Sequence, residues 1–425
     1  MDTATPAGPI TSPHPGSSSD APGRRFGGRR RRGPAVTLAA LAALAVSTVT
    51  AGCGGGSSGS GDGQAAGASG AAPRSGSAAV AVAVSVTADG CSASPASVPA
   101  GPVSFTVRNV DADDVSEIEL SRAGDDDILA SRENLMPGST RTFSVRLAAG
   151  SYSLGCEGAK NEAGPLAVTG SAAAPTLSAA QQAIATSYHT YAVGQAGQLV
   201  TKTKVFTDAI RAGDMTAAMN AYGPAHLIYE NIEFVGDHVD DGKLDMAIDA
   251  RETAAQEGDG DQTEWTGFHR LEKMLWGDRS LTGAAPLATR LDTDIAAFRD
   301  LLGSHSFTPV ELANGAAASI DETLEVHLPA LEDHYSHTGL WDVAGKVESA
   351  NQIFTLLRPT VEQADNGLAE QVQTELTGIT GKLATLRTGD RYVDYSTVAD
   401  PDRKALIATA TRLDDALSKV PALVV

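Results

Sequence analysis

The sequence TGFHRLEKMLWG at residues 266–277 has the period of an α-helix. At a turn of about 100° per residue, Phe268 and Leu271 fall on one stripe, which predicts a helix packed on a core. His269 and Glu272 are three positions apart, so they project from the same side, next to that stripe. An imidazole and a carboxylate held in this way supply metal ligands, but one helix cannot complete a coordination sphere. The other ligands must come from elsewhere in the chain.

The same pair has a simpler explanation. A histidine and a glutamate at this spacing often form a surface hydrogen bond worth a few tenths of a kcal/mol. A zinc peptidase would need a second histidine, but Lys273 stands where an HxxEH pattern requires it, and the sequence has no HExxH. Ligand count therefore disfavours hydrolysis.

Several motifs, in order along the chain, resemble a known family. TGFHRLEKMLWG, the earlier YENIE at 229–233 and the later HYSHTGLWD at 334–342 are similar to the imelysin-like domain of EfeO-type iron-uptake proteins. ENLMPG at 133–138 and GSYSLGCEG at 150–158 resemble the cupredoxin-like domain that precedes it. The resemblance implies an iron-binding component that works with an iron permease and a haem peroxidase of an EfeUOB-type system. It also implies two four-helix bundles in the helical domain.

Residues 1–52 have the pattern of an export signal. Arginines at 29–32 precede an apolar run at 35–49, which is too short to span a bilayer comfortably. Cys53 then resembles a lipoprotein processing site, with an ordinary cleaved signal as the alternative. We expect a protein of the cell envelope, outside the cytoplasmic membrane, tethered through Cys53 and the flexible Gly- and Ser-rich linker at 53–78.

The chain is acidic, with 32 basic and 52 acidic residues and a net charge of −20. The predicted signal holds six arginines and two aspartates, so its removal leaves 26 basic and 50 acidic residues, a net charge of −24. Such a surface repels nucleic acid and attracts cations. Solubility explains most of these carboxylates equally well.

Residues 79–170 have the period of β-strands. Runs such as AVAVAVSVTA at 79–88 and PVSFTVRNV at 102–110, separated by turn residues, predict a β-sandwich. This segment has no histidine, which excludes a blue-copper ligand set, so the cupredoxin-like resemblance is one of fold.

Cys91 and Cys156 both lie in the predicted sandwich. Outside the cytoplasm two such thiols are expected to pair, which would stabilise the domain by about 4 kcal/mol. The alternative is a secondary zinc or copper site, for which the family resemblance would add Glu117 and Glu119 as ligands.

Residues 176–425 change to a period of 3.6 residues and predict an all-α domain. The expected helices span about 178–212, 215–235, 245–256, 265–276, 287–302, 309–326, 341–357, 366–388 and 400–419.

Further carboxylates in this domain are candidate ligands. Glu230 and Glu233 share one helix face; His226 lies there too, but it precedes the matched motif and we leave it out. Asp294 and Glu348 lie on other helices, from which carboxylates reach bundle metal sites. Each has a simpler explanation as a solvated face or an ion pair. The predicted site for ferric or ferrous iron consists of His269, Glu272, Glu230, Glu233, Asp294 and Glu348.

Two other functions are open at this point. Imelysin relatives are classed among peptidases, so a metallopeptidase is one alternative. A binding protein for an acidic polysaccharide is the other, although the net charge disfavours an anionic partner.

Overall fold

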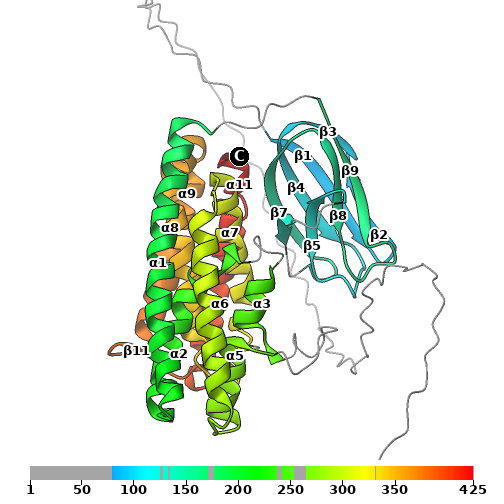
Figure 1. Cartoon of the computed structure of the whole chain (residues 1–425). Coiled ribbons are helices and arrows are strands. Elements are labelled where there is room, and N and C mark those ends of the chain that lie inside the picture. The colour runs from blue at the N-terminus through cyan, green and yellow to red at the C-terminus, as the bar shows by residue number, and fades with distance from the viewer. Residues whose placement is uncertain are drawn as a thin grey trace, which may run out of the picture.

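The structure is a computed structural model that describes residues 79–124, 128–132, 135–170, 177–236, 242–252, 265–330 and 332–424. The predicted export signal, the linker and Cys53 lie outside the described residues, as do Glu133 and Asn134 of the ENLMPG motif. Within the described ranges, no helix combines the length and the apolar character needed to cross a membrane. Figure 1 shows the strands of residues 80–169 on one side of the molecule and the helices, with the short strand β11 (Arg391–Tyr392), on the other.

The N-terminal domain contains two sheets, with strand orders β2-β1-β4-β7 and β3-β9-β8-β5-β6. Alternation along β1 places Val82, Val84 and Val86 in the core. Both sheets contribute to one hydrophobic core, in which Phe105 stacks on Phe143 at 4.7 Å between ring centroids. A β-rich domain is thus confirmed, while the cupredoxin-like assignment stays a prediction. The strands are β1 Val80–Thr87, β2 Gly90–Ser94, β3 Ser97–Pro99, β4 Gly101–Asn109, β5 Ile118–Arg122, β6 Ile128–Arg132, β7 Thr140–Leu147, β8 Gly150–Gly155 and β9 Ala163–Thr169.

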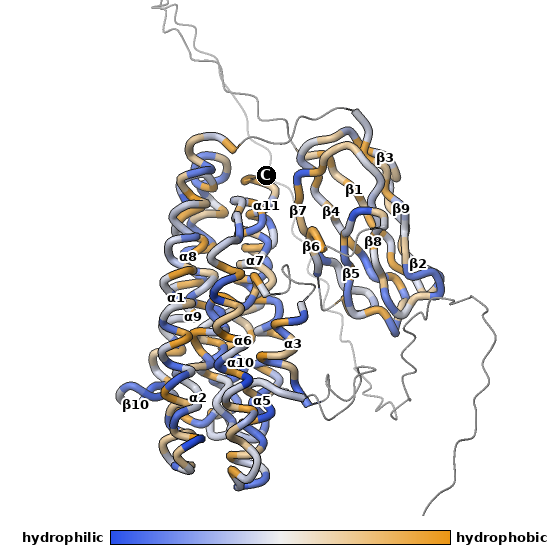
Figure 2. Tube along the Cα trace, viewed as in Figure 1, coloured by the Kyte–Doolittle hydropathy of each residue, from blue (hydrophilic) through white to orange (hydrophobic). Residues whose placement is uncertain are grey.

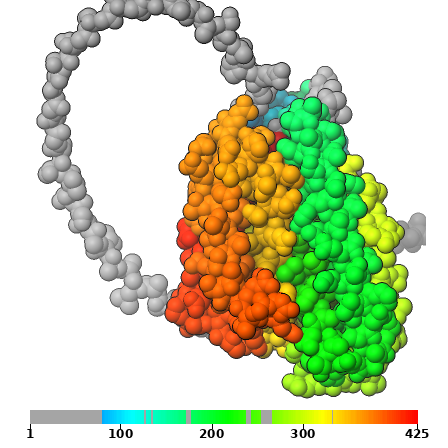
Figure 3. Space-filling view, turned by 90° about the vertical axis from the view of Figure 1, so that its left-hand side faces the viewer, coloured from blue at the N-terminus to red at the C-terminus, as the bar shows by residue number. Residues whose placement is uncertain are grey.

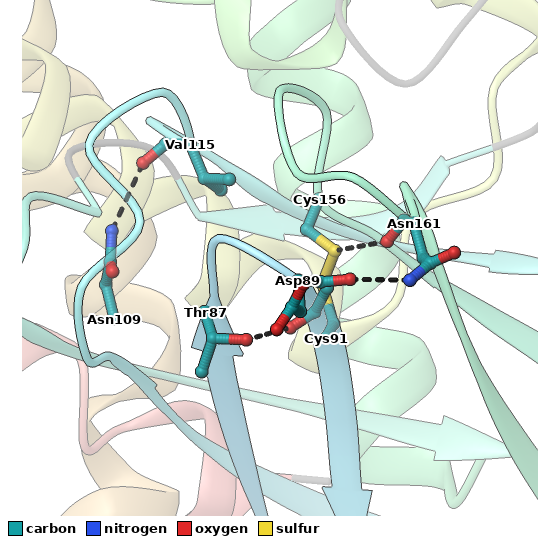
Figure 4. The surroundings of a disulfide bond; sticks show 8 residues. Thr87, Asp89, Cys91, Asn109, Val115, Cys156 and Asn161 are labelled. Carbon is teal, nitrogen blue, oxygen red and sulfur yellow. Dashed lines mark hydrogen bonds between the residues drawn. A yellow bond between two sulfur atoms is a disulfide. The ribbon is translucent and has the colours of Figure 1, made fainter.

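A disulfide joins Cys91 of β2 to Cys156, which follows β8, with 6.3 Å between the Cα atoms (Figure 4). Nearby, the Asn161 side chain donates a hydrogen bond to the Asp89 carbonyl at 2.7 Å. Because both sulfurs are bonded to each other, neither is a thiolate that could bind zinc or copper.

The C-terminal domain is helical, as predicted. Two of its helices begin with a capping box: Ser178 with Gln181 before α1, and Thr308 with Glu311 before α7. The α-helices are α1 Ala179–Arg211, α2 Met215–Glu230, α3 Lys243–Asp249, α5 Gly267–Glu272, α6 Ala284–Ser304, α7 Pro309–Glu322, α8 Leu340–Ala364, α9 Asn366–Thr385, α10 Asp400–Leu417 and α11 Pro421–Val424. Shorter elements are the 3-10 helices η1 Glu233–Val235 and η6 Tyr395–Thr397, the π-helical segments η4 Lys273–Gly277 and η5 Thr323–His327, and the strands β10 Arg387–Thr388 and β11 Arg391–Tyr392.

One hydrophobic core runs through the helical domain. Helix α1 packs on α2 and α6, while α8 packs on α7, α9 and α2. Figure 3 shows α1 in green directly beside the orange helices of the C-terminal half, and Figure 2 shows hydrophobic and hydrophilic segments alternating along the helices. The division into two four-helix bundles stays a prediction.

Some helix boundaries differ from those expected. The predicted helix at 215–235 ends at Glu230 and is followed by η1, and the one at 245–256 ends at Asp249. The predicted helices at 265–276 and 309–326 both change to π-helix in their last turn. A π turn contains an extra residue, so it redirects the side chains that follow.

The two domains touch through β6 and β7 on one side and α7 and α11 on the other. The Asn314 side chain donates to the Ser144 carbonyl at 2.7 Å, and the Thr142 hydroxyl donates to the Ser418 carbonyl at 3.1 Å. These hydrogen bonds fix the sandwich against the helices.

Candidate metal centre

The HxxE pair of α5 faces the interior rather than solvent. His269 and Glu272 are both buried, with His269 Nδ1 3.3 Å from Glu272 Oε2. Gly267, at the start of α5, has φ +88°, and a Cβ there would lie 2.1 Å from the Ile248 carbonyl oxygen. Only glycine therefore lets α5 approach α3 so closely, and this contact brings His269 to Asp249.

Three imidazoles and three carboxylates alternate around a closed ring inside the helical domain. They come from α2, α3, α5, η5 and the loop after η5, and all six residues are buried. We call these residues the His/carboxylate ring. Its successive nitrogen–oxygen distances are 2.7 Å (His226–Asp249), 3.6 Å (Asp249–His269), 3.2 Å (His269–Glu332), 2.8 Å (Glu332–His327), 3.5 Å (His327–Glu230) and 3.3 Å (Glu230–His226).

Further carboxylates hold the nitrogens that face away from the ring. His226 Nδ1 lies 2.9 Å from Asp342 Oδ1, and Glu272 occupies the equivalent place at His269 Nδ1. Glu272 is itself fixed, because its Oε1 accepts hydrogen bonds from the backbone N–H groups of residues 335 and 336 at 3.0 and 2.7 Å. The Nε2 atoms of both histidines consequently point at other ring members.

A buried lysine adjoins the ring. Lys346 Nζ lies 3.3 Å from Glu230 Oε2 and donates hydrogen bonds to Glu233 and Glu322. Helix α8 can approach α2 because Gly345 has no side chain; a Cβ there would lie 2.6 Å from the Glu230 Cβ. Glu230 therefore belongs to both the ring and the lysine cluster.

Carboxylates outnumber positive groups in this network. Lys346, Arg251 beside Glu332 and three protonated imidazoles would supply at most five positive charges. Burial raises the pKa of Glu230, Glu233 and Asp342, so protons neutralise part of this excess, and a bound cation would displace them. The eight carboxylates in contact with these groups are Glu230, Glu233, Asp249, Glu272, Glu322, Glu332, Asp333 and Asp342.

The neighbouring charges control the protonation of the histidines. Burial alone would lower the pKa of His327, but the carboxylates of Glu332 and Glu230 raise it to about 9. Burial would also lower the pKa of His226, yet Asp249 and Asp342 raise it well above the usual value. The metal-free ring therefore holds protons that an incoming cation would displace.

Several ring atoms lack a well-directed hydrogen bond from the described part of the chain. Ligand atoms of His226, Asp249 and His269 lie within 4.8 Å of one another, a separation suited to a shared ion. Buried polar atoms are normally hydrogen-bonded, so ring atoms that face an oppositely charged ring member at 2.8–3.5 Å without such a bond are candidate ligand atoms. The atoms concerned are both carboxylate oxygens of Glu230, Nε2 of His269, both ring nitrogens of His327 and Oε2 of Glu332.

Comparison with known proteins identifies the family. The imelysin family matches residues 184–420. The iron uptake system component EfeO of Yersinia pseudotuberculosis serotype I (strain IP32953) is 34% identical over 332 residues, which cover 78% of this chain and 87% of the relative. EfeO of Escherichia coli (strain K12) is 34% identical over 337 residues, 78% of this chain and 88% of the relative. The chain belongs to the EfeO family.

All of the ring and Lys346 lie inside the imelysin match of this EfeO-family chain. The EfeO relatives are named for iron uptake and not for an enzymatic reaction. The peptidase designation of imelysin is a family label and says nothing of the chemistry here.

The structure brings four of the six predicted ligands together. His269 and Glu230 are members of the ring, and Glu272 adjoins it. Glu233 contacts Lys346 and lies one step further from the imidazoles.

The remaining predicted residues lie away from the ring. Asp294 on α6 forms an ion pair with Arg290, with 2.6 Å between Oδ2 and Nε. Glu348 is exposed on α8. His334 and His337, which belong to the matched HYSHTGLWD motif, are also exposed.

Sequence reasoning passed over several ring members and their partners. His226 is not among the predicted ligands, although it lies four residues before Glu230 on the same helix. Asp342 lies within HYSHTGLWD, and Glu332 lies two residues before it, so proximity to the motif was the available signal. Asp249 had no local signal at all, because nothing in its helix indicates that it faces His269.

Of the sandwich residues proposed for a secondary site, Glu119 lies on β5 with Glu117 just before that strand, Cys91 lies on β2 of the other sheet, and Cys156 follows β8. Glu117 and Glu119 flank the buried Ile118, and Glu119 pairs with Gly155, next to Cys156. Burial, together with Glu157, raises the pKa of Glu119. Since both cysteines are in the disulfide, a metal here would depend on carboxylates alone.

Proposed function

We propose that this chain binds iron as cargo in the His/carboxylate ring and acts as the iron-binding component of an EfeUOB-type uptake system. The observation that carries the proposal is the ring itself: alternating imidazoles and carboxylates, all buried, with ligand atoms that lack directed hydrogen bonds. Membership of the EfeO family supports iron as the cargo.

The donor set is hard and anionic. Imidazole nitrogens and carboxylate oxygens suit ferric or ferrous iron and would also accept zinc or manganese. The ring offers three histidines where the sequence predicted one, which favours retention of a ferrous ion as well. Proton release on binding would make capture reversible and dependent on pH.

Within this proposal the two residues of the HxxE pair have different roles. His269 presents Nε2 to the ring and binds the ion. Glu272 holds the opposite nitrogen and is a positioning residue, since a carboxylate on the outer nitrogen fixes the imidazole and raises its basicity. Asp342 does the same for His226.

We extend the proposal to the remainder of the system. The chain is tethered outside the cytoplasmic membrane through Cys53, and it delivers iron to the permease with the haem peroxidase as a further partner. Its sandwich is cupredoxin-like, and its helices form two bundles. No catalytic step is required of this chain.

The test is calorimetric titration of the metal-free protein with ferrous iron under anaerobic conditions. Glu272→Gln is expected to weaken binding about 10- to 100-fold, and His269→Ala to weaken it further. His334→Ala, at an exposed histidine of the same domain, is the matched control and should bind like the wild type. Undiminished binding by His269→Ala would place the iron site elsewhere.

A further inference from the structure

The His/carboxylate ring is enclosed, so an ion must reach it through another part of the molecule. All six ring residues are buried. This question rests on the proposed function, because only a protein that takes up and releases cargo needs such a route.

A groove lies between the two domains, where β6 faces α7. We call it the interdomain groove. Its lining includes three carboxylates and one guanidinium, and Arg141 pairs with one of these carboxylates, so a net negative charge remains that attracts cations. The lining residues used in this argument are Leu129, Arg132, Phe234, Glu311, Asp321 and Glu322.

A series of carboxylates leads from this groove to the ring. The side chain of Glu322 is 28% exposed, that of Glu233 is 10% exposed and that of Glu230 is 1% exposed. Lys346 Nζ contacts all three, so the three carboxylates surround a single point. Exposure falls step by step from the groove to the ring.

We infer that the interdomain groove is the access route for the cation, with Glu322 at its outer end and Lys346 at its inner end. A cation that leaves water is costly to bury unless a counter-charge accompanies it. Glu322, Glu233 and Glu230 supply that charge in succession. The Lys346 ammonium occupies the path in the metal-free protein, and the arriving ion replaces it as the partner of Glu230.

The ring is less suited to admit a cation at Glu332. There Arg251, 36% exposed, lies 3.9 Å from Glu332. A guanidinium at that position repels an incoming cation. The Arg251 guanidinium therefore favours entry of the cation from the side of the sandwich.

The test separates rates from affinity, because a route changes association and dissociation equally and leaves the equilibrium constant unchanged. Leu129 is 41% exposed in the groove, so Leu129→Trp narrows the groove without disturbing a core. Val110→Trp, at a 49% exposed position outside the groove lining, is the matched control. Stopped-flow exchange of ferrous iron with a colorimetric chelator gives both rate constants.

We expect Leu129→Trp to slow association and dissociation at least about fivefold with Kd within about twofold, and Val110→Trp to leave both unchanged. Glu322→Gln should slow association and reduce its dependence on ionic strength. Wild-type rate constants in both Leu129→Trp and Glu322→Gln would overturn the inference. A Kd changed in Leu129→Trp while association and dissociation do not slow together would also overturn it. Faster association in Arg251→Gln would overturn it as well, because it would place the route at Glu332. Failure of the wild type to bind iron would instead overturn the proposed function.

Discussion

Glu230 is the residue where the two polar networks of the helical domain meet. It contacts two imidazoles of the ring on one side and Lys346 on the other. Burial raises its pKa, so its charge is costly in the metal-free protein, although Lys346 and the histidines offset part of that cost. A carboxylate in such a place stabilises a bound cation more than it stabilises the fold.

Glu230→Gln should therefore weaken iron binding by more than about tenfold, about 1.4 kcal/mol, while the melting temperature of the metal-free protein stays the same or rises. Titration calorimetry and thermal unfolding measure the two effects. Glu348→Gln, at an exposed glutamate of α8, should change neither. A variant that binds iron normally would show that Glu230 is not a ligand.

Among the elements, the contact of α8 with α2 determines the geometry of the ring. Gly345 lies directly against Glu230, and a methyl group would overlap its Cβ and the Leu227 carbonyl. The positions of both Glu230 and Lys346 depend on this close approach.

Gly345→Ala should destabilise the domain by about 1–3 kcal/mol through overpacking and weaken iron binding as α8 moves away. The matched control is Gly381→Ala in α9, where no atom lies within 4 Å of the added Cβ. That change should stabilise by about 0.5–1 kcal/mol with no effect on binding. Chemical denaturation measures the stability of each variant, and calorimetric titration measures its iron binding. Equal changes in the Gly345→Ala and Gly381→Ala variants would contradict this account.

The disulfide between β2 and the end of β8 is a second link between secondary-structure elements. It closes a loop with a sequence separation of 65 residues. The double variant Cys91→Ser, Cys156→Ser should lower sandwich stability by about 4 kcal/mol on the loop-entropy model. Iron binding in the helical domain should not change. Loss of bound iron together with the disulfide would instead indicate a ligand role for the cysteines.

Across the whole molecule, charged groups link the domains. Arg141 of the sandwich lies 3.5 Å from Asp321 of α7. Burial raises the pKa of the nearby Asp414 to about 7, Asp321 adds to the rise, and Arg132 and Arg141 reduce it. Asp414 therefore keeps a proton in the folded protein over a pH range in which the unfolded chain has lost it.

The sign of the pH effect follows. Between about pH 4 and pH 7 the folded state binds more protons at Asp414 than the unfolded state does, so its contribution to stability falls as pH rises. Asp414→Asn should remove this pH dependence and raise the free energy of unfolding at pH 8, because it removes a charge that is costly in the folded state. The expected gain is on the order of 1 kcal/mol, since partial exposure of Asp414 screens the charge. Thermal unfolding at pH 5 and pH 8 measures it, with the exposed neighbour Asp415→Asn as control. A variant with the wild-type pH profile would contradict the assignment.

The division into a β-rich and a helical domain is predictable from the amino-acid sequence, because side-chain periods of 2 and 3.6 are local properties of the chain. It also placed His269 and Glu272 on one helix face, whereas the prediction that Glu230 and Glu233 share one helix was wrong, because α2 ends at Glu230 and Glu233 lies in η1. Helix periodicity says which residues share a face, and it does not say which faces meet.

Which of these faces surround one point depends on how the helices pack, and the sequence pattern does not contain that information. Asp249 of α3 and Glu332 contact His269 of α5, and His327 of the π-helical η5 contacts Glu332, whereas Asp294 pairs with Arg290 and Glu348 is exposed. The physical reason is that helix packing depends on close approaches, such as those at Gly267 and Gly345, between segments far apart in the chain. These contacts, and not the ligand motif alone, convert a surface-type HxxE pattern into a buried ring.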